Sequence, residues 1–155
     1  MEDKLIQPFI NATLNVIGTM ASVPLEAGEV YIKNDPKTWG QVTGIVGMAG
    51  EEVSGNMVAS FDTGSICEIV SSMLGEDHTE INDDITDAVG ELTNMISSNA
   101  RSELSKLNIE LDMAIPMVVV GEGLQISQLG ENQVTVIPFK TPKGEFVVAV
   151  GLSSK

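Results

Sequence analysis

Glu91 and Asn94 are the residues of this 155-residue chain whose types and spacing best suit chemistry on another molecule. A carboxylate accepts hydrogen bonds and pairs with cations, whereas a carboxamide both donates and accepts hydrogen bonds. The two lie in a segment, residues 83–107, whose apolar residues recur every three to four positions. This period predicts a long amphipathic helix, on which residues three apart are neighbours one turn apart. Spacing alone leaves their role open, because outward polar residues are usual on a surface helix.

The predicted helix has an apolar stripe and an opposite polar face. At 100° per residue, its apolar residues fall within about 160° of arc. The stripe consists of Ile85, Ala88, Val89, Leu92, Ile96, Ala100, Leu104 and Leu107. The opposite face consists of Asp87, Glu91, Asn94, Ser98 and Arg101. Asp83 and Asp84 suit the helix start, where carboxylates stabilise free N–H groups, and Asn108 fits its end.

The remaining elements are predicted from periodicity and from turn residues. Helices are expected over residues 3–20 and 65–74, the second with Thr63 as a possible N-cap and Gly75 as its stop. Strands are expected over residues 30–32, 41–48, 53–61, 113–120, 124–129, 133–139 and 146–152. Turns are expected at 34–36, 49–52 and 142–144. This order predicts an α+β fold (an α/β two-layer arrangement) with a mostly antiparallel sheet, as a single domain covering residues 1–155.

The amino-acid composition argues against some classes of binding partner. The formal net charge is −14, from 22 acidic and 8 basic residues, which argues against nucleic acid and anionic membranes. The charge fits either a cationic partner or simple solubility. The acidic stretch 76–91 could steer a partner that presents lysine, or be a solvated loop and helix start. No apolar run approaches the ~18 residues of a membrane span, no signal pattern opens the chain, and we expect a cytoplasmic protein.

Other reactive side chains do not form a recognisable site in the sequence. His78 has no Cys or His partner at metal spacing, so no metal site is predicted and an exposed loop histidine is expected. Cys67 lies among apolar residues and is expected in the core. Gly44, Gly47, Gly50 and Gly55 lack the ending of a phosphate-binding loop, so close backbone packing or bulges are expected.

The chain resembles the CheC/CheX/FliY family of chemotaxis phosphatases, and the CheX type in particular. Family members carry an acidic residue or serine, a glutamate and an asparagine on one helix, and a proline some twenty residues later. The matching positions here are Asp87, Glu91, Asn94 and Pro116. Residues 90–95, the glycine-rich hairpin 42–61 and residues 73–75 are also similar, and the resemblance covers roughly residues 5–150.

One departure separates the chain from the CheC type, which carries two such helices. Asn11 and Asn15 lie on the first predicted helix, but Pro8 and Ala12 occupy the positions three before them. A single intact site is therefore expected.

The resemblance implies that the chain hydrolyses the aspartyl phosphate of a phosphorylated CheY-like response regulator. Asn94 would orient the attacking water, Glu91 would pair with the regulator's lysine, and Asp87 and Ser98 would contact the regulator. No cofactor or metal is expected on this chain, because Mg²⁺ would be held by the regulator. A homodimer is implied, for which strands near the C-terminus are one candidate for edge-to-edge pairing. The alternative is a non-catalytic module that binds a regulator or a flagellar switch component.

Overall fold

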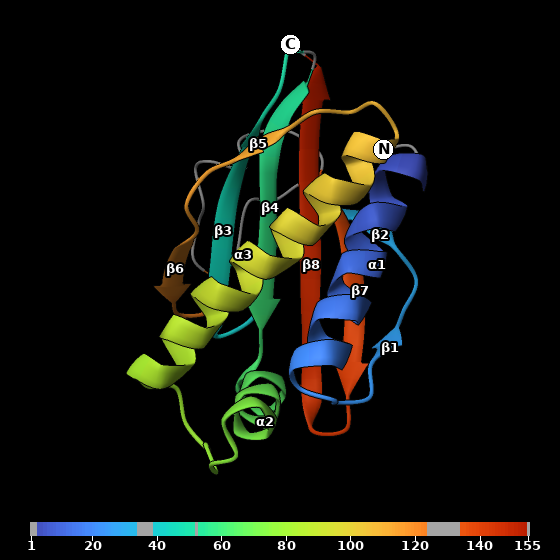
Figure 1. Cartoon of the computed structure of the whole chain (residues 1–155). Helices are drawn as coiled ribbons and strands as arrows, with labels where there is room; N and C mark the ends of the chain where they lie inside the picture. The colour runs from blue at the N-terminus through green and yellow to red at the C-terminus, as the bar shows by residue number, and fades with distance from the viewer. Residues whose placement is uncertain (1–2, 34–38, 52, 124–133, 155) are drawn as a thin grey trace.

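One antiparallel sheet forms the centre of the computed structural model, which describes residues 3–33, 39–51, 53–123 and 134–154 (Figure 1). Its strands are β1 (Glu26–Ala27), β2 (Tyr31–Lys33), β3 (Val42–Ala49), β4 (Val53–Phe61), β5 (Asp112–Met113), β6 (Met117–Val120), β7 (Val134–Thr141) and β8 (Gly144–Ser154). The order is β1-β7-β8-β4-β3-β5, with β2 also on β7 and β6 also on β3.

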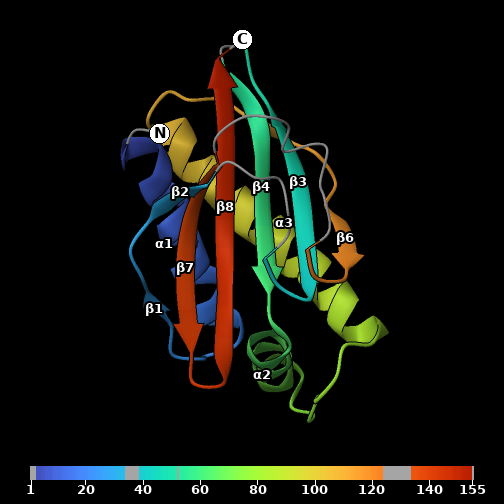
Figure 2. The ribbon, with the colours of Figure 1, turned by 180° about the vertical axis from the view of Figure 1, so that it is seen from behind.

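The helices in the described residues are α1 (Asp3–Met20), α2 (Thr63–Leu74) and α3 (Asp83–Lys106). Figure 1 shows α1 and α3 side by side across one face of the sheet, with α2 at one end. Seen from behind in Figure 2, the strands lie in front of both long helices. This architecture confirms the predicted α+β fold. None of the described helices is long and apolar enough to cross a membrane.

The main core lies between the sheet and the two long helices. Alternate residues of each strand face the helices, so Phe61, Phe139 and Phe146 meet there in stacked pairs with ring centroids 4.8 and 5.1 Å apart. A smaller apolar cluster lies on the other face of the sheet, and it contains Ile45, Val58, Val134, Val136, Val147 and Ala149. The centre of the sheet is therefore buried on both faces.

A glycine on β3 sets how closely α3 approaches the sheet. A Cβ atom added at Gly44 would lie 2.0 Å from the Thr93 Oγ1 atom and 2.9 Å from its Cβ. Thr93 is buried, and its hydroxyl donates to the Val89 carbonyl at 2.7 Å. Asn94, about 100° further round the helix than Thr93, is exposed.

Several boundaries differ from the sequence predictions. The N-cap of α2 is Asp62, whose carboxylate accepts from the Ser65 N–H at 2.7 Å, so the choice of Thr63 was wrong. Gly75 ends α2 with a φ of 68°, as predicted. α3 begins after Asn82, which accepts from the Ile85 N–H, and ends with Leu107 rather than Asn108 as its C-cap.

The predicted strand 113–120 is split into β5 and β6. Both pair with β3, but Pro116 has no N–H to donate to a ladder, and the chain leaves the sheet at residues 114–116. The C-terminal strands are not free edges, since β8 pairs with β4 and β7, and β7 also pairs with β1 and β2. The predicted turn 34–36 and strand 124–129 lie outside the described residues.

Candidate functional site

Asp87, Glu91 and Asn94 line one open depression of about 490 Å³ on the exterior of α3. Pro116, which is distant in sequence, lies on the opposite wall. Thr86, Gly90, Ile115 and Val118 complete the lining. The structure therefore gathers all four positions that carry the family resemblance at one surface site.

The exposed face of α3 is the one that helical periodicity predicted. Asp87, Glu91, Asn94, Ser98 and Arg101 are all exposed. The opposite stripe is buried, except that Ala88 is half-buried and Leu107 at the helix end is 47% exposed, so burial of Leu107 was wrongly predicted. Ser98 shares the outward face but does not line the depression.

The two candidate chemical groups are the side chains of Glu91 and Asn94. Among the described residues, neither the Asn94 carboxamide nor the Glu91 carboxylate makes a side-chain hydrogen bond or ion pair. The one hydrogen bond at Asn94 uses its backbone carbonyl, which accepts from Ser97 Oγ at 3.0 Å. Both side chains thus keep their hydrogen-bonding capacity for another molecule, while the helix backbone beneath them is fixed.

The second wall was not predicted from the sequence. Ile115 is 91% exposed, because the chain turns out of the sheet between β5 and β6. The Ala114 N–H donates to the Gly47 carbonyl at 2.9 Å, which anchors this turn to β3. The only signal in the sequence was Pro116, since a proline within an apolar run weakens a strand prediction.

The electrostatics of the depression are anionic. Asp87 and Glu91 both line it, and the nearby Arg101 pairs instead with Asp112 at 3.3 Å. In the described part of the chain, neither Asp87 nor Glu91 belongs to a cluster of three side chains that could hold a metal ion. The site therefore suits a cationic group on a partner.

The structure also tests the predictions for the other reactive residues. Cys67 is buried as expected, and burial raises the pKa of its thiol, with a smaller contribution from the Glu80 carboxylate. The prediction of an exposed His78 was wrong, because its side chain is only 6% exposed.

Close packing explains Gly44, Gly50 and Gly55 of the hairpin, against a side chain at Gly44 and chiefly against backbone at the other two. An added Cβ would meet atoms within 3 Å at Gly44, Gly50 and Gly55. At Gly47 the nearest atom would be 3.7 Å away, an ordinary contact, so close packing does not account for this position.

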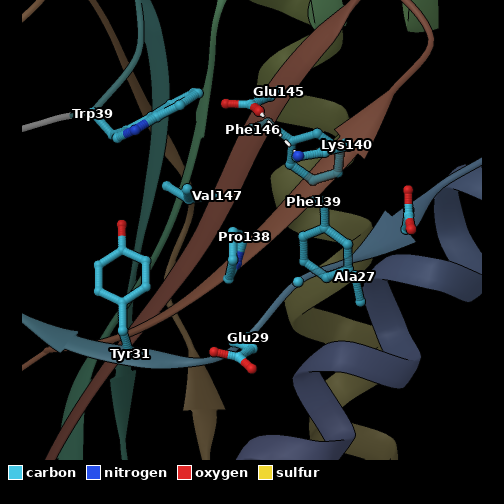
Figure 3. A pocket seen from close by; sticks show the side chains of 12 residues that line it. Ala27, Glu29, Tyr31, Trp39, Pro138, Phe139, Lys140, Glu145, Phe146 and Val147 are labelled. Carbon is cyan, nitrogen blue, oxygen red and sulfur yellow. Dashed lines mark ion pairs between the residues drawn. The ribbon is translucent and has the colours of Figure 1, made fainter.

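A second cavity of about 430 Å³ lies near the opposite edge of the sheet, beside β1, β2, β7 and β8 (Figure 3). Tyr31, Trp39 and Pro138 line it, and Lys140 and Glu145 form an ion pair at 4.0 Å on its wall. It shares no lining residue with the depression beside Asn94.

Comparison with known proteins identifies the family. The family model for the chemotaxis phosphatase CheX matches residues 42–140. A CheC-like superfamily protein from Shewanella sp. PV-4 is 36% identical and has a TM-score of 0.91, with 99% of each chain covered.

Two further relatives are described by what they bind or act on. A complex of CheX with CheY, BeF₃ and Mg²⁺ from Borrelia burgdorferi contains a chain that is 25% identical, with a TM-score of 0.80 over 95% of this chain and 96% of that one. The CheY-P phosphatase CheX of Thermotoga maritima is 22% identical over 131 residues, or 84% of each protein. With well over half of its residues matched by the family model, the chain belongs to the CheX family of chemotaxis phosphatases.

Proposed function

We propose that this chain removes the phosphoryl group from the phosphoaspartate of a CheY-type response regulator. Membership of the CheX family supports a phosphatase, and the Thermotoga relative is a CheY-P phosphatase. The Borrelia relative forms a complex with CheY. The observation that carries the proposal is the pair Glu91 and Asn94, whose side chains have no partner among the described residues and which line one depression together with Pro116.

Asn94 acts on the attacking water in this proposal. Hydrolysis of an acyl phosphate needs a water in line with the leaving oxygen and positive charge at the phosphoryl oxygens. The regulator supplies Mg²⁺ and a lysine, so this chain has only to orient the water. A carboxamide suits that task because its oxygen accepts from the water while its NH₂ group donates to a neighbouring oxygen. No covalent intermediate forms on this chain, and no cofactor is bound by it.

Glu91 fixes the approach of α3 to the regulator. It lies one turn before Asn94 on the exposed face, so pairing with the regulator's lysine would direct Asn94 at the phosphoryl group. Asp87 extends the anionic wall by another turn and contributes to the same docking. Ser98 lies beyond the depression, and we assign it a contact at the edge of the docking surface.

Ile115 supplies the apolar part of this docking surface. A side chain that is 91% exposed beside a depression gains stability when a partner covers it. The proposed surface therefore combines a polar wall on α3 with an apolar wall between β5 and β6.

The test is dephosphorylation of the organism's own candidate regulators by the wild type, Asn94→Ala and Glu91→Ala. Asn15→Ala is the matched control, because Asn15 is also an exposed helical asparagine but lies on α1. We expect Asn94→Ala to lower the maximal rate about 100-fold or more, since misplacing a reacting group by 1 Å has that effect. We expect Glu91→Ala mainly to weaken binding of the regulator.

A second measurement, binding of each variant to the regulator that carries BeF₃ in place of the phosphoryl group, separates a loss of hydrolysis from a loss of binding. Asn94→Ala should bind like the wild type while failing to hydrolyse. Near wild-type rates in both variants would refute the assignment. Tight binding without any hydrolysis by the wild type would instead favour the non-catalytic binding module.

A homodimer acting in the cytoplasm, where response regulators are found, is also part of the proposal. Tyr31 and Ile32 of β2, and Val30 just before it, are each more than 40% exposed, which supports burial of this segment against a second copy. Light scattering on the purified chain should give twice the monomer mass. A monomer at all concentrations used in the activity assay would refute this part.

A further inference from the structure

His78 has a buried imidazole nitrogen with no hydrogen-bond partner among the described residues. Its side chain is 6% exposed, and Nε2 is buried and unpaired. The Glu76 carboxylate lies near it, with Oε2 3.8 Å from Nε2, which is too far for a hydrogen bond. Buried polar nitrogens are nearly always satisfied, so this atom requires an explanation.

The position of His78 is fixed by α2. Its backbone N–H donates to Ser71 Oγ at 2.8 Å, and the Ser71 hydroxyl donates to the His78 carbonyl at 3.4 Å. This pair of contacts anchors the connector between α2 and α3. The backbone of His78 is therefore fixed, and its imidazole is packed inside the protein, with 6% of the side chain exposed.

Two carboxylates from different segments lie close to the imidazole. Glu76 lies in the connector just after α2, and Asp84 lies in the first turn of α3. One potential ligand atom from each of Glu76, His78 and Asp84 lies within 4.8 Å of the other two. Asn82 caps α3 through its own side chain, so Asp84 is not needed as the N-cap.

We propose that Glu76, His78 and Asp84 form a binding site for a transition-metal dication, with Zn²⁺ as the best match. Ligand atoms about 2.0–2.1 Å from zinc lie roughly 3.3 Å apart in tetrahedral geometry. The present separations come within this range by side-chain rotation, since the Glu76 side chain is 70% exposed and Asp84 is also exposed. The packed imidazole and two mobile carboxylates would leave a fourth position for water.

One imidazole and two carboxylates favour some metal ions over others. Imidazole nitrogen suits Zn²⁺, Cu²⁺ and Ni²⁺, whereas Mg²⁺ and Ca²⁺ prefer oxygen ligands. The Mg²⁺ that phosphoryl transfer on the regulator requires should therefore leave this site empty. Bound Zn²⁺ would join the connector to the start of α3, one turn before Asp87, and would neutralise local negative charge.

The test is calorimetric titration of the full-length, tag-free, metal-free chain with ZnCl₂, and with MgCl₂ and CaCl₂ as competitors. The variants are His78→Gln and Asp84→Asn. Asp83→Asn is the matched control, because it removes the same charge from the same helical turn. Co²⁺ is a second probe, since the position and intensity of its visible absorption report the coordination geometry.

We expect one Zn²⁺ per chain, unaffected by Mg²⁺ or Ca²⁺. His78→Gln should weaken binding about 100-fold or more, because even outer-shell partners of metal ligands contribute 10- to 100-fold. Asp84→Asn should weaken it strongly and Asp83→Asn at most a few fold. Circular dichroism of the metal-free variants checks that each is folded. The absence of Zn²⁺ binding, or binding and Co²⁺ absorption that survive His78→Gln in a folded chain, would overturn the proposal.

Discussion

Replacing Gly44 with alanine should push the functional helix away from the sheet. The added Cβ would lie 2.0 Å from Thr93 Oγ1, whereas ordinary contacts begin near 3.4 Å. The two atoms must therefore separate by about 1.4 Å, which a packed core resists. Rotation of the Thr93 side chain does not remove the conflict without loss of its 2.7 Å hydrogen bond to the Val89 carbonyl.

The displacement should affect both stability and activity. Overpacking of this kind costs about 1–3 kcal/mol of unfolding free energy, which leaves a typical domain folded. Asn94 follows Thr93 on the same rigid helix, so it moves with it. A shift of about 1 Å should lower the dephosphorylation rate about 100-fold, equivalent to about 2.7 kcal/mol of transition-state stabilisation.

The assay combines thermal unfolding with dephosphorylation measured well below the unfolding midpoint. Gly47→Ala is the control on the same strand, because its nearest neighbour would lie 3.7 Å away, and we expect it to resemble the wild type. In the double variant Gly44→Ala/Thr93→Ala, the Cβ of residue 93, 2.9 Å from the added Cβ, is the close contact that remains. We expect this variant to recover most of the stability and most of the dephosphorylation rate. Wild-type stability and rate in Gly44→Ala, or no rescue by Thr93→Ala, would refute the reasoning.

Three further predictions concern docking, pH and helix termination. Ile115→Ser should weaken binding of the BeF₃-activated regulator about 10-fold or more without changing the melting temperature, since burying an isoleucine contributes about 1.5–3 kcal/mol; an unchanged Kd by calorimetry would remove Ile115 from the docking surface. The pKa of Cys67 is raised in the folded protein because burial favours the neutral thiol. The folded state therefore keeps its full stability below the ordinary thiol pKa, 9.0, and loses stability as pH rises through the raised pKa. Cys67→Ala should therefore flatten the alkaline fall in melting temperature, and a fall identical to that of the wild type would contradict this. Gly75→Ala should lower the unfolding free energy by about 1 kcal/mol in urea, because φ is 68° there and no atom lies within 4 Å of the added Cβ; full wild-type stability would show that the C-cap conformation is not costly for alanine.

The long helix and its outward face were predictable because they depend on local periodicity. The apolar stripe of α3 repeats over many turns, so its direction is well determined, and Glu91 and Asn94 followed as exposed neighbours. Periodicity does not determine the helix end. Leu107 is apolar and in phase with the stripe, but it lies at the C-cap, beyond the sheet contacts, and is exposed.

Features that depend on tertiary contacts were not predictable. Asp and Thr are both favourable residue types at an N-cap, so the sequence does not separate Asp62 from Thr63. Asp62 is favoured by a tertiary contact, because its second carboxylate oxygen accepts from the Glu145 N–H at 2.9 Å. Burial of His78 depends on the Ser71 contacts of a connector with no periodicity of its own. The exposure of Ile115 depends on where β5 and β6 each pair with β3.

The two walls of the depression come from separate parts of the chain, and this has an evolutionary consequence. Glu91 and Asn94 lie on one helix whose internal geometry hardly varies, whereas residues 114–116 form a short irregular link between two strands. Under the proposed function, substitutions in that link would change which regulator is preferred without disturbing Glu91 and Asn94. The choice of regulator and the rate of hydrolysis would then evolve independently in proteins that share this fold.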